Sequence, residues 1–221
     1  MISPEKLDQM QAGWVRLLAR YDVPPADAYP VFDRLVAAHT EPHRHYHTLE
    51  HLAEMFKVAG KLGDVATDPA AVSLAIWFHD AVYDPRAKDN EDRSAEFAVE
   101  QLWPLHLSDE TLCRVGRLIR ATAHTPLDVV DADTAVLLDA DLAILSADPK
   151  RYARYAADVR KEYAWVPDEA YRQGRAAVLT GFLERPRIYR TERMFAAAEE
   201  AARANLRTEI ATLSGDTIPS P

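Results

Sequence analysis

The chain has 221 residues, with 35 acidic and 26 basic side chains and a net charge of -9. A negative surface repels the phosphate backbone, so we expect no broad nucleic-acid interface, whereas a local basic pocket for a small anion stays open. Apolar residues make up 48% of the sequence and charged residues 28%, a mixture that excludes general disorder. The chain is long enough to bury a large core without disulfides.

The longest nearly apolar stretch, residues 70–78, is far shorter than the roughly 20 residues that span a bilayer. The first six residues have neither a basic start nor an apolar core, so no secretory signal is predicted. We therefore expect a cytoplasmic protein without a membrane partner. The single cysteine, Cys113, has apolar neighbours and is expected to be a small buried side chain.

Apolar residues recur at three and four positions along most of the chain, and only 7 glycines occur, so most of the chain is predicted to be helical. The first predicted helix covers 4–21, the second runs from the prolines at 24–25 to about 39, and the third and fourth cover 49–63 and 69–78. The fifth has Asn90 as its N-cap, and the sixth lies around 112–119. The last four cover 133–145, 149–163, 167–183 and 191–213.

No segment alternates polar and apolar residues as a sheet requires, and no repeat or linker divides the chain. We predict an all-α fold, a single-domain helical bundle of about ten helices over residues 1–213. Its core covers about 40–147, additional C-terminal helices cover 148–213, and 214–221 form a flexible tail. Residues 69–78 are apolar on every side, which places that helix at the centre of the bundle.

Five of the eight histidines fall within thirteen residues, at His39, His43, His45, His47 and His51. His47 and His51 are four apart at the start of a predicted helix, so their rings are expected on one face, where they can share a metal ion. For the other three we prefer the simpler interpretation of a solvated helix start.

His79 and Asp80 directly follow the most apolar helix. A carboxylate at the edge of a core is costly unless it is paired or binds a cation, and a metal ion would satisfy both side chains. A polar helix C-terminus is the alternative. Asp139 and Asp141 interrupt another apolar helix, and residues two apart point about 200° away from each other. We expect Asp141 to face inward and Asp139 to stay solvated.

The ordered pattern of His47, His79-Asp80 and Asp141, with 32 residues from 47 to 79 and 61 from 80 to 141, resembles the HD-domain superfamily of metal-dependent phosphohydrolases. Segments 47–53, 75–84 and 139–142 carry this resemblance, and segments 46–51, 90–95, 121–124 and 162–167 are similar to a bacterial subgroup of predicted HD phosphohydrolases, over about residues 10–206. The resemblance implies an HD-like helical fold and a metal site formed by these four side chains. His51 is a further candidate ligand, and the resemblance favours His47 as the first one.

Two imidazoles and two carboxylates suit Mn, Fe, Co, Ni or Zn, with Mg weaker because of the nitrogen ligands. Four protein ligands on an octahedral ion leave positions for water and a phosphate oxygen. The predicted reaction is hydrolysis of a phosphate ester of a small molecule, with a nucleotide as one candidate. The oligomeric state is not predicted.

Supporting roles are assigned to polar residues near these motifs. Glu91 is the candidate to orient or deprotonate water, with Asp84 as its alternative, and His124 is the candidate to protonate the leaving oxygen or bind phosphate. Arg44 and Arg93 are the nearest basic candidates for phosphate. The simpler alternatives are that Glu91 only interacts with the helix dipole, that His124 only ends a helix, and that Arg44 and Arg93 are solvated.

Two other functions compete with this prediction. His47, Glu50 and His51 match the inverted zinc-peptidase motif, in which the glutamate activates water, but that interpretation leaves His79 and Asp80 without a role. A non-catalytic module that binds a metal and a phosphorylated metabolite is the other alternative. A peptidase would lose activity when Glu50 is substituted, whereas a phosphohydrolase would lose activity when Asp80 is substituted.

Overall fold

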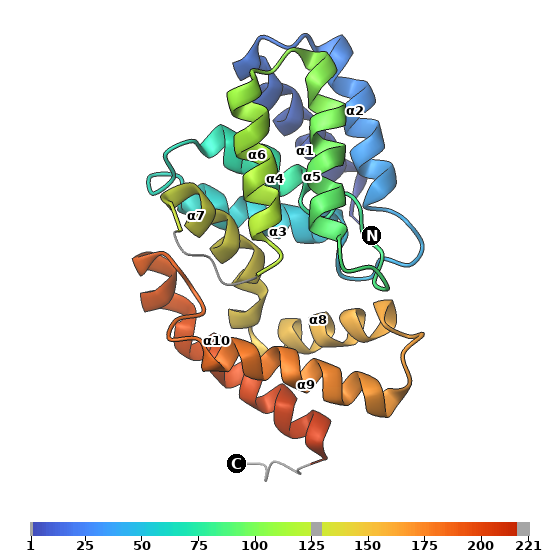
Figure 1. Ribbon diagram of the computed structural model, residues 1–221, viewed down its shortest axis with the longest axis vertical. Coiled ribbons are helices and arrows are strands. Elements are labelled where there is room, and N and C mark those ends of the chain that lie inside the picture. The colour runs from blue at the N-terminus through green and yellow to red at the C-terminus, as the bar shows by residue number, and fades with distance from the viewer. Residues whose placement is uncertain (1, 125–129, 216–221) are drawn as a thin grey trace.

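The computed structural model describes residues 2–124 and 130–215, which form ten α-helices and three short 3₁₀ turns but no strand (Figure 1). The predicted all-α helical bundle is confirmed. The helices are α1 (Pro4–Leu18), α2 (Pro25–Ala38), α3 (Leu49–Lys61), α4 (Pro69–Phe78), α5 (Asn90–Leu102), α6 (Asp109–Ala121), α7 (Ala132–Asp141), α8 (Pro149–Glu162), α9 (Asp168–Glu184) and α10 (Glu192–Ser214), and the turns are η1 (Ala19–Tyr21), η2 (Trp103–Leu105) and η3 (Leu142–Ser146).

Most helices begin where a short polar side chain accepts a hydrogen bond from the first turn, which satisfies backbone donors that have no partner within the helix. These N-caps are Ser3, Thr48, Asp68, Ser108, Asp131, Asp148 and Thr191. Proline occupies an early position in four of the ten helices, where its missing N–H costs nothing.

Three predicted boundaries were wrong in detail. Asn90 is the first residue of α5 and not its N-cap, because its side chain instead bonds to the backbone N–H and carbonyl of Asp84. The helix predicted at 133–145 is α-helical only to Asp141, after which η3 begins. Gly215, with φ of 79°, ends α10, so Ser214 of the predicted tail is helical and residues 216–221 lie outside the described residues.

Buried apolar side chains form two separate clusters. The first surrounds α4, in which every residue except Pro69 and Ser73 is buried, and includes an edge-to-face contact between Trp14 and Trp77 at 5.6 Å. The second is built from η3, α8, α9 and α10. Figure 1 shows α8, α9 and α10 as a lower layer beneath the helices of the first cluster. No helix in the described residues is both long and apolar enough to cross a membrane.

Two expectations about single side chains were wrong. Cys113 is exposed, because Leu112 and Val115 occupy the inward face of α6 and Cys113 lies between them on the outer face. His39 is buried and not solvated, since it ends α2 and its Nδ1 donates to the Leu35 carbonyl at 2.9 Å.

The connection between α9 and α10, residues 185–191, is a segment that we call the strap. Its backbone is held by three charged side chains from α7 and α10. Glu199 accepts from two backbone N–H groups of the strap, Asp139 accepts from two others, and Arg203 donates to the carbonyls at its start. Asp139 is 0% exposed, so the expectation that it stays solvated was wrong. It does point away from Asp141, but the strap covers that side of α7.

Asp139→Ala should destabilise the protein strongly, because it leaves the backbone N–H groups of Arg190 and Thr191 and the Thr191 hydroxyl without their acceptor. We expect the free energy of unfolding in urea to fall by about 3 kcal/mol. The control is Asp148→Ala, which removes an exposed N-cap of α8 and should cost about 1 kcal/mol. Equal losses in the two variants would contradict this account of the strap.

Candidate metal centre

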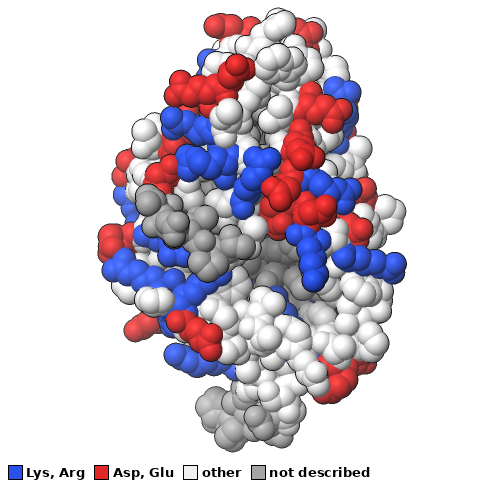
Figure 2. All heavy atoms as spheres, in the orientation of Figure 1, with Lys and Arg blue, Asp and Glu red and all other residues white. Residues whose placement is uncertain are grey.

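A cavity of about 1370 Å³ lies between the two apolar clusters. Its wall comes from the segment before α3, the ends of α4, α6 and α7, the start of α5, and the facing sides of α8, α9 and the strap. Figure 2 shows one face of the molecule hollowed near its centre, with Lys and Arg side chains on either side. The volume exceeds that of most small-molecule sites, about 300–1,000 Å³.

Four side chains, from α3, from the residues that follow α4 and from the end of α7, lie close together, and three of them line the cavity, namely His79, Asp80 and Asp141. His51, His79 and Asp141 each offer one ligand atom, and these atoms all lie within 4.8 Å of one another. His51 Nε2 is 3.2 Å from Asp141 Oδ1, and His79 Nε2 is 3.9 Å from the same oxygen. Asp80 Oδ2 lies 2.9 Å from His79 Nε2 and 3.9 Å from His51 Nε2. We call His51, His79, Asp80 and Asp141 the cluster.

The two histidines of the cluster present nitrogen atoms without hydrogen-bond partners. His79 Nδ1 donates to the Ile76 carbonyl at 3.0 Å, so in a neutral ring the lone pair is on Nε2, which faces the carboxylates. The Nε2 atoms of His51 and His79 are buried and make no hydrogen bond. Buried polar atoms normally have partners, and a neutral imidazole held through Nδ1 is a common metal ligand. The buried group of His51, His79 and Asp141 could therefore hold a metal ion.

The electrostatics of the cluster favour a cation. Burial alone would lower the pKa of His79, but the Asp80 and Asp141 carboxylates raise it to about 9. Burial alone would raise the pKa of Asp80, but His79 and neighbouring imidazoles hold it well below its usual range. The pKa of Asp141 is also held well below its usual range, against the effect of burial, by the hydrogen bond from His124 and the nearby imidazoles of His51 and His79. Both carboxylates are thus ionised at neutral pH and attract positive charge.

His47, which the resemblance favours as the first ligand, lies outside the group of mutually close ligand atoms. Its Nδ1 is 2.7 Å from Glu162 Oε2, and its ring centre is 6.0 Å from that of His51. The reason is that α3 begins at Leu49, after the N-cap Thr48, so the two histidines do not share a helical face. The structure therefore brings His51, and not His47, to the cluster.

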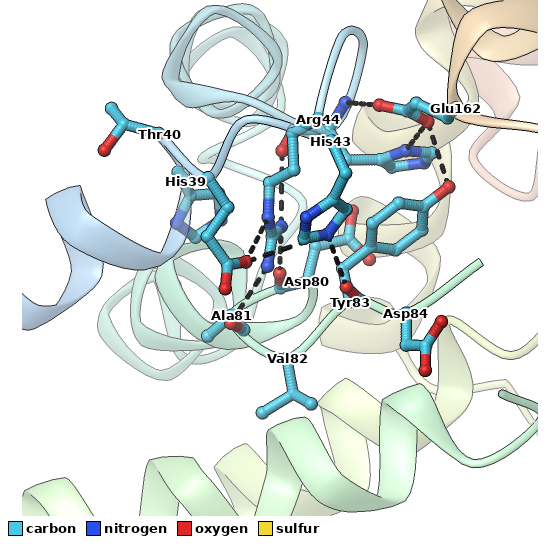
Figure 3. A network of polar contacts seen from close by, with 12 residues as sticks. His39, Thr40, His43, Arg44, Asp80, Ala81, Val82, Tyr83, Asp84 and Glu162 are labelled. Carbon is cyan, nitrogen blue, oxygen red and sulfur yellow. Dashed lines mark hydrogen bonds and ion pairs between the residues drawn. The ribbon is translucent and has the colours of Figure 1, made fainter. Parts of the chain in front are cut away.

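Glu162, the last residue of α8, was predicted only as the first residue of the segment 162–167, with no role assigned to it. It is 4% exposed and accepts hydrogen bonds from the backbone N–H groups of residues 45–47 and from the Tyr83 hydroxyl, the latter at 2.9 Å (Figure 3). Burial alone would raise the pKa of Glu162, but His47 and the backbone donors lower it to about 2. A single glutamate in the last turn of an amphipathic helix gives no sequence signal that distinguishes it from a surface residue.

Neither predicted phosphate-binding arginine lines the cavity. The Arg44 side chain is buried, and Figure 3 shows it reaching the backbone oxygens of Asp80 at 2.6 Å and Ala81 at 3.1 Å. It fixes the backbone of the segment that carries Asp80. Arg93 is exposed on α5.

The three predicted catalytic residues are placed differently. His124 lines the cavity, and its Nε2 donates to Asp141 Oδ2 at 2.9 Å. Glu91 also lines the cavity, in the first turn of α5. Asp84 is exposed and outside the lining, and it accepts a hydrogen bond from the Arg86 backbone N–H.

The cavity lining also includes residues that were not predicted to bind phosphate. Its cationic members are Lys88, Arg175, Arg185, Arg187 and Arg190, and its aromatic members include Tyr155, Tyr163, Tyr171 and Phe182. All but one of them come from the C-terminal part of the chain, and only the folding of α8 and α9 over the first cluster brings them to the cavity.

The chain matches no family model, no curated protein and no solved structure. The resemblance to the HD-domain superfamily thus stays a prediction from the motifs, and the case for a metal centre rests on the geometry of the cluster.

Metal binding should depend on His51 more than on His47. In isothermal titration of chelator-treated protein with Mn²⁺, His51→Ala should weaken binding by about 100-fold or more, since it removes a ligand. The matched variant His47→Gln keeps a donor for Glu162 and should retain affinity to within about threefold. The reverse order of effects would show that His47 is the ligand.

Glu162 should stabilise the fold in a pH-dependent manner. Its carboxyl has a pKa of about 2 in the folded chain against an ordinary value of 4.5, so its contribution is fully present above pH 4.5 and is lost as pH falls towards 2. We expect Glu162→Gln to lower the free energy of unfolding by about 3 kcal/mol at pH 6 and by about 1.4 kcal/mol at pH 3. Urea titrations at both pH values measure the difference.

The control for the loss of one charge is Glu100→Gln, at an exposed position on α5. If Glu162→Gln lowers the free energy of unfolding by the same amount at pH 6 and at pH 3, the pKa assigned to Glu162 is contradicted.

Proposed function

We propose that the protein is a metal-dependent phosphohydrolase of the HD-domain superfamily, which hydrolyses a phosphate ester of a small molecule in the central cavity. The observation that carries this proposal is a buried group in which His51 Nε2, His79 Nε2 and an Asp141 oxygen lie within 4.8 Å of one another, with Asp80 Oδ2 2.9 Å from His79 Nε2. This donor set of two nitrogens and two oxygens suits a divalent transition metal.

The four side chains of the cluster would hold the ion. When bound, such an ion supplies a hydroxide near neutral pH and stabilises negative charge on the phosphoryl oxygens. His79 is held in position by the Ile76 carbonyl, and Asp141 by the N–H of His124. His124 therefore orients a ligand carboxylate, a role that differs from the proton donor predicted from the sequence.

His47 and Glu162 form a second functional unit beside the cluster. Both oxygens of Glu162 accept from the His47 residue, one from its Nδ1 and the other from its backbone N–H, which fixes the ring. His47 lines the cavity, and a histidine oriented through Nδ1 has Nε2 free to transfer a proton. We assign to His47 Nε2 the donation of a proton to the leaving oxygen, and Glu91 stays the candidate to orient the attacking water.

The geometry favours this reaction over the zinc-peptidase alternative. In a peptidase, Glu50 would have to reach the water at the metal, but it does not line the cavity and one of its oxygens is 2.8 Å from Arg154 Nη2. His47 and His51 would also have to share the ion, and His47 is bound to Glu162 instead.

A direct test is hydrolysis of p-nitrophenyl phosphate and a panel of nucleotides by the purified protein loaded with Mn²⁺. We expect turnover that a chelator abolishes and Mn²⁺ restores. Asp80→Asn should lower kcat at least about 1,000-fold, because it removes an anionic ligand, and His47→Gln should lower it by about 100-fold through loss of the acid.

Glu50→Gln is the control and should retain activity, since Glu50 does not line the cavity. A protein that binds Mn²⁺ and phosphate but hydrolyses nothing in the panel would be a binding module and not a hydrolase. Cleavage of a peptide substrate that is lost in Glu50→Gln and kept in Asp80→Asn would establish the peptidase.

A further inference from the structure

Two arginines on the cavity wall have no carboxylate partner among residues 2–124 and 130–215. Arg185 and Arg190, which we call the arginine pair, both lie on the strap and line the cavity. Arg175, on the same wall, forms a two-point ion pair with Glu209 at 2.8 and 3.2 Å, and its charge is neutralised. The pair differs in that neither of its guanidinium groups forms an ion pair with a carboxylate of the described residues.

The two guanidinium groups influence each other. Burial and the neighbouring charge of Arg190 lower the pKa of Arg185. Arg185 is half-buried, stacks over the Phe182 ring at 4.4 Å and donates from Nη2 to the His124 carbonyl at 2.9 Å. Arg190 is exposed, and its charge repels that of the half-buried Arg185. In a chain of net charge -9, two such cations are not explained by a generally basic surface.

The backbone that carries the pair is held firmly. Asp139 directs one oxygen to the backbone N–H of Arg190 and the other to that of Thr191. It attracts Arg190 through space, but both of its oxygens are engaged by these donors and by the Thr191 hydroxyl. Arg203 donates to the Arg185 carbonyl at 2.7 Å. A fixed backbone lowers the entropy lost when a ligand binds the side chains it presents.

The arginine pair adjoins the metal cluster without joining it. His124 links the two, since its carbonyl accepts from Arg185 and its ring donates to Asp141. An anion held by the pair would therefore lie near the group held by the metal. A phosphate carries a charge of about -1.5 to -2, which matches two guanidinium groups, whereas a carboxylate would leave one charge uncompensated.

We propose that Arg185 and Arg190 form an anion subsite, separate from the metal cluster, that binds a second phosphate group of the substrate. The statement that this phosphate belongs to the substrate rests on the proposed function, whereas the binding of phosphate by the arginine pair does not. The substrate class is then a small molecule with two phosphate groups, one at the metal and one at the arginine pair.

The test begins with chelator-treated protein at low ionic strength, titrated with inorganic phosphate in a calorimeter. We expect one phosphate per chain, with affinity about tenfold lower in Arg185→Gln and in Arg190→Gln and about 100-fold lower in the double variant. Acetate should bind at least about tenfold more weakly than phosphate. The control is Arg207→Gln, at an exposed arginine of α10 that does not line the cavity, and its affinity should equal that of wild type.

Circular dichroism and the melting temperature establish that the variants are folded. Wild-type affinity in a folded double variant, no phosphate binding by the wild-type protein, or equal binding of acetate and phosphate would each overturn the subsite.

Activity separates the second phosphate from the one that is cleaved. With the Mn²⁺ protein, the double variant should lower kcat/KM about 100-fold for a nucleoside diphosphate or bisphosphate and leave p-nitrophenyl phosphate within about threefold. Equal losses for both substrates would assign the pair to the cleaved phosphate and overturn this proposal. Intact phosphate binding without any hydrolysis would overturn the proposed reaction and leave the subsite supported.

Discussion

The structure depends on one electrostatic constraint, the placement of two ionised carboxylates between two apolar cores. Asp80 and Asp141 have side chains only 16% exposed, and a carboxylate at that depth is costly unless a positive charge compensates it. Without an ion, a proton on His79 supplies this charge, because the carboxylates raise the pKa of His79 to about 9. A divalent cation would displace that proton, so metal affinity should rise with pH.

Buried charged side chains fix the backbone segments that surround the cavity. Arg44 holds the carbonyl of Asp80, Glu162 holds the backbone and ring of His47, and Asp139 holds the strap. Each connects parts of the chain that are at least 36 residues apart. The same mechanism thus recurs three times around the cavity, and each buried charge is satisfied by several hydrogen bonds, as burial requires.

Local signals predicted the helices, because periodicity, caps and prolines act over one or two turns. The order of His and Asp residues also indicated three of the four members of the cluster. The sequence left the choice between His47 and His51 open, because it depends on where α3 begins relative to His47. The roles of Arg44 and Glu162 depend on contacts between distant segments. An arginine or a glutamate in the sequence does not indicate which distant segment it contacts. The arginine pair was missed for the same reason.

The central claim is that one cation binds to side chains from three helices. The most direct measurement is an anomalous difference map from crystals grown with Mn²⁺. The account predicts a single strong peak within about 2.0–2.4 Å of His51 Nε2, His79 Nε2 and one oxygen each of Asp80 and Asp141. A peak bound to His47 in place of His51, or no peak at these residues, would contradict it.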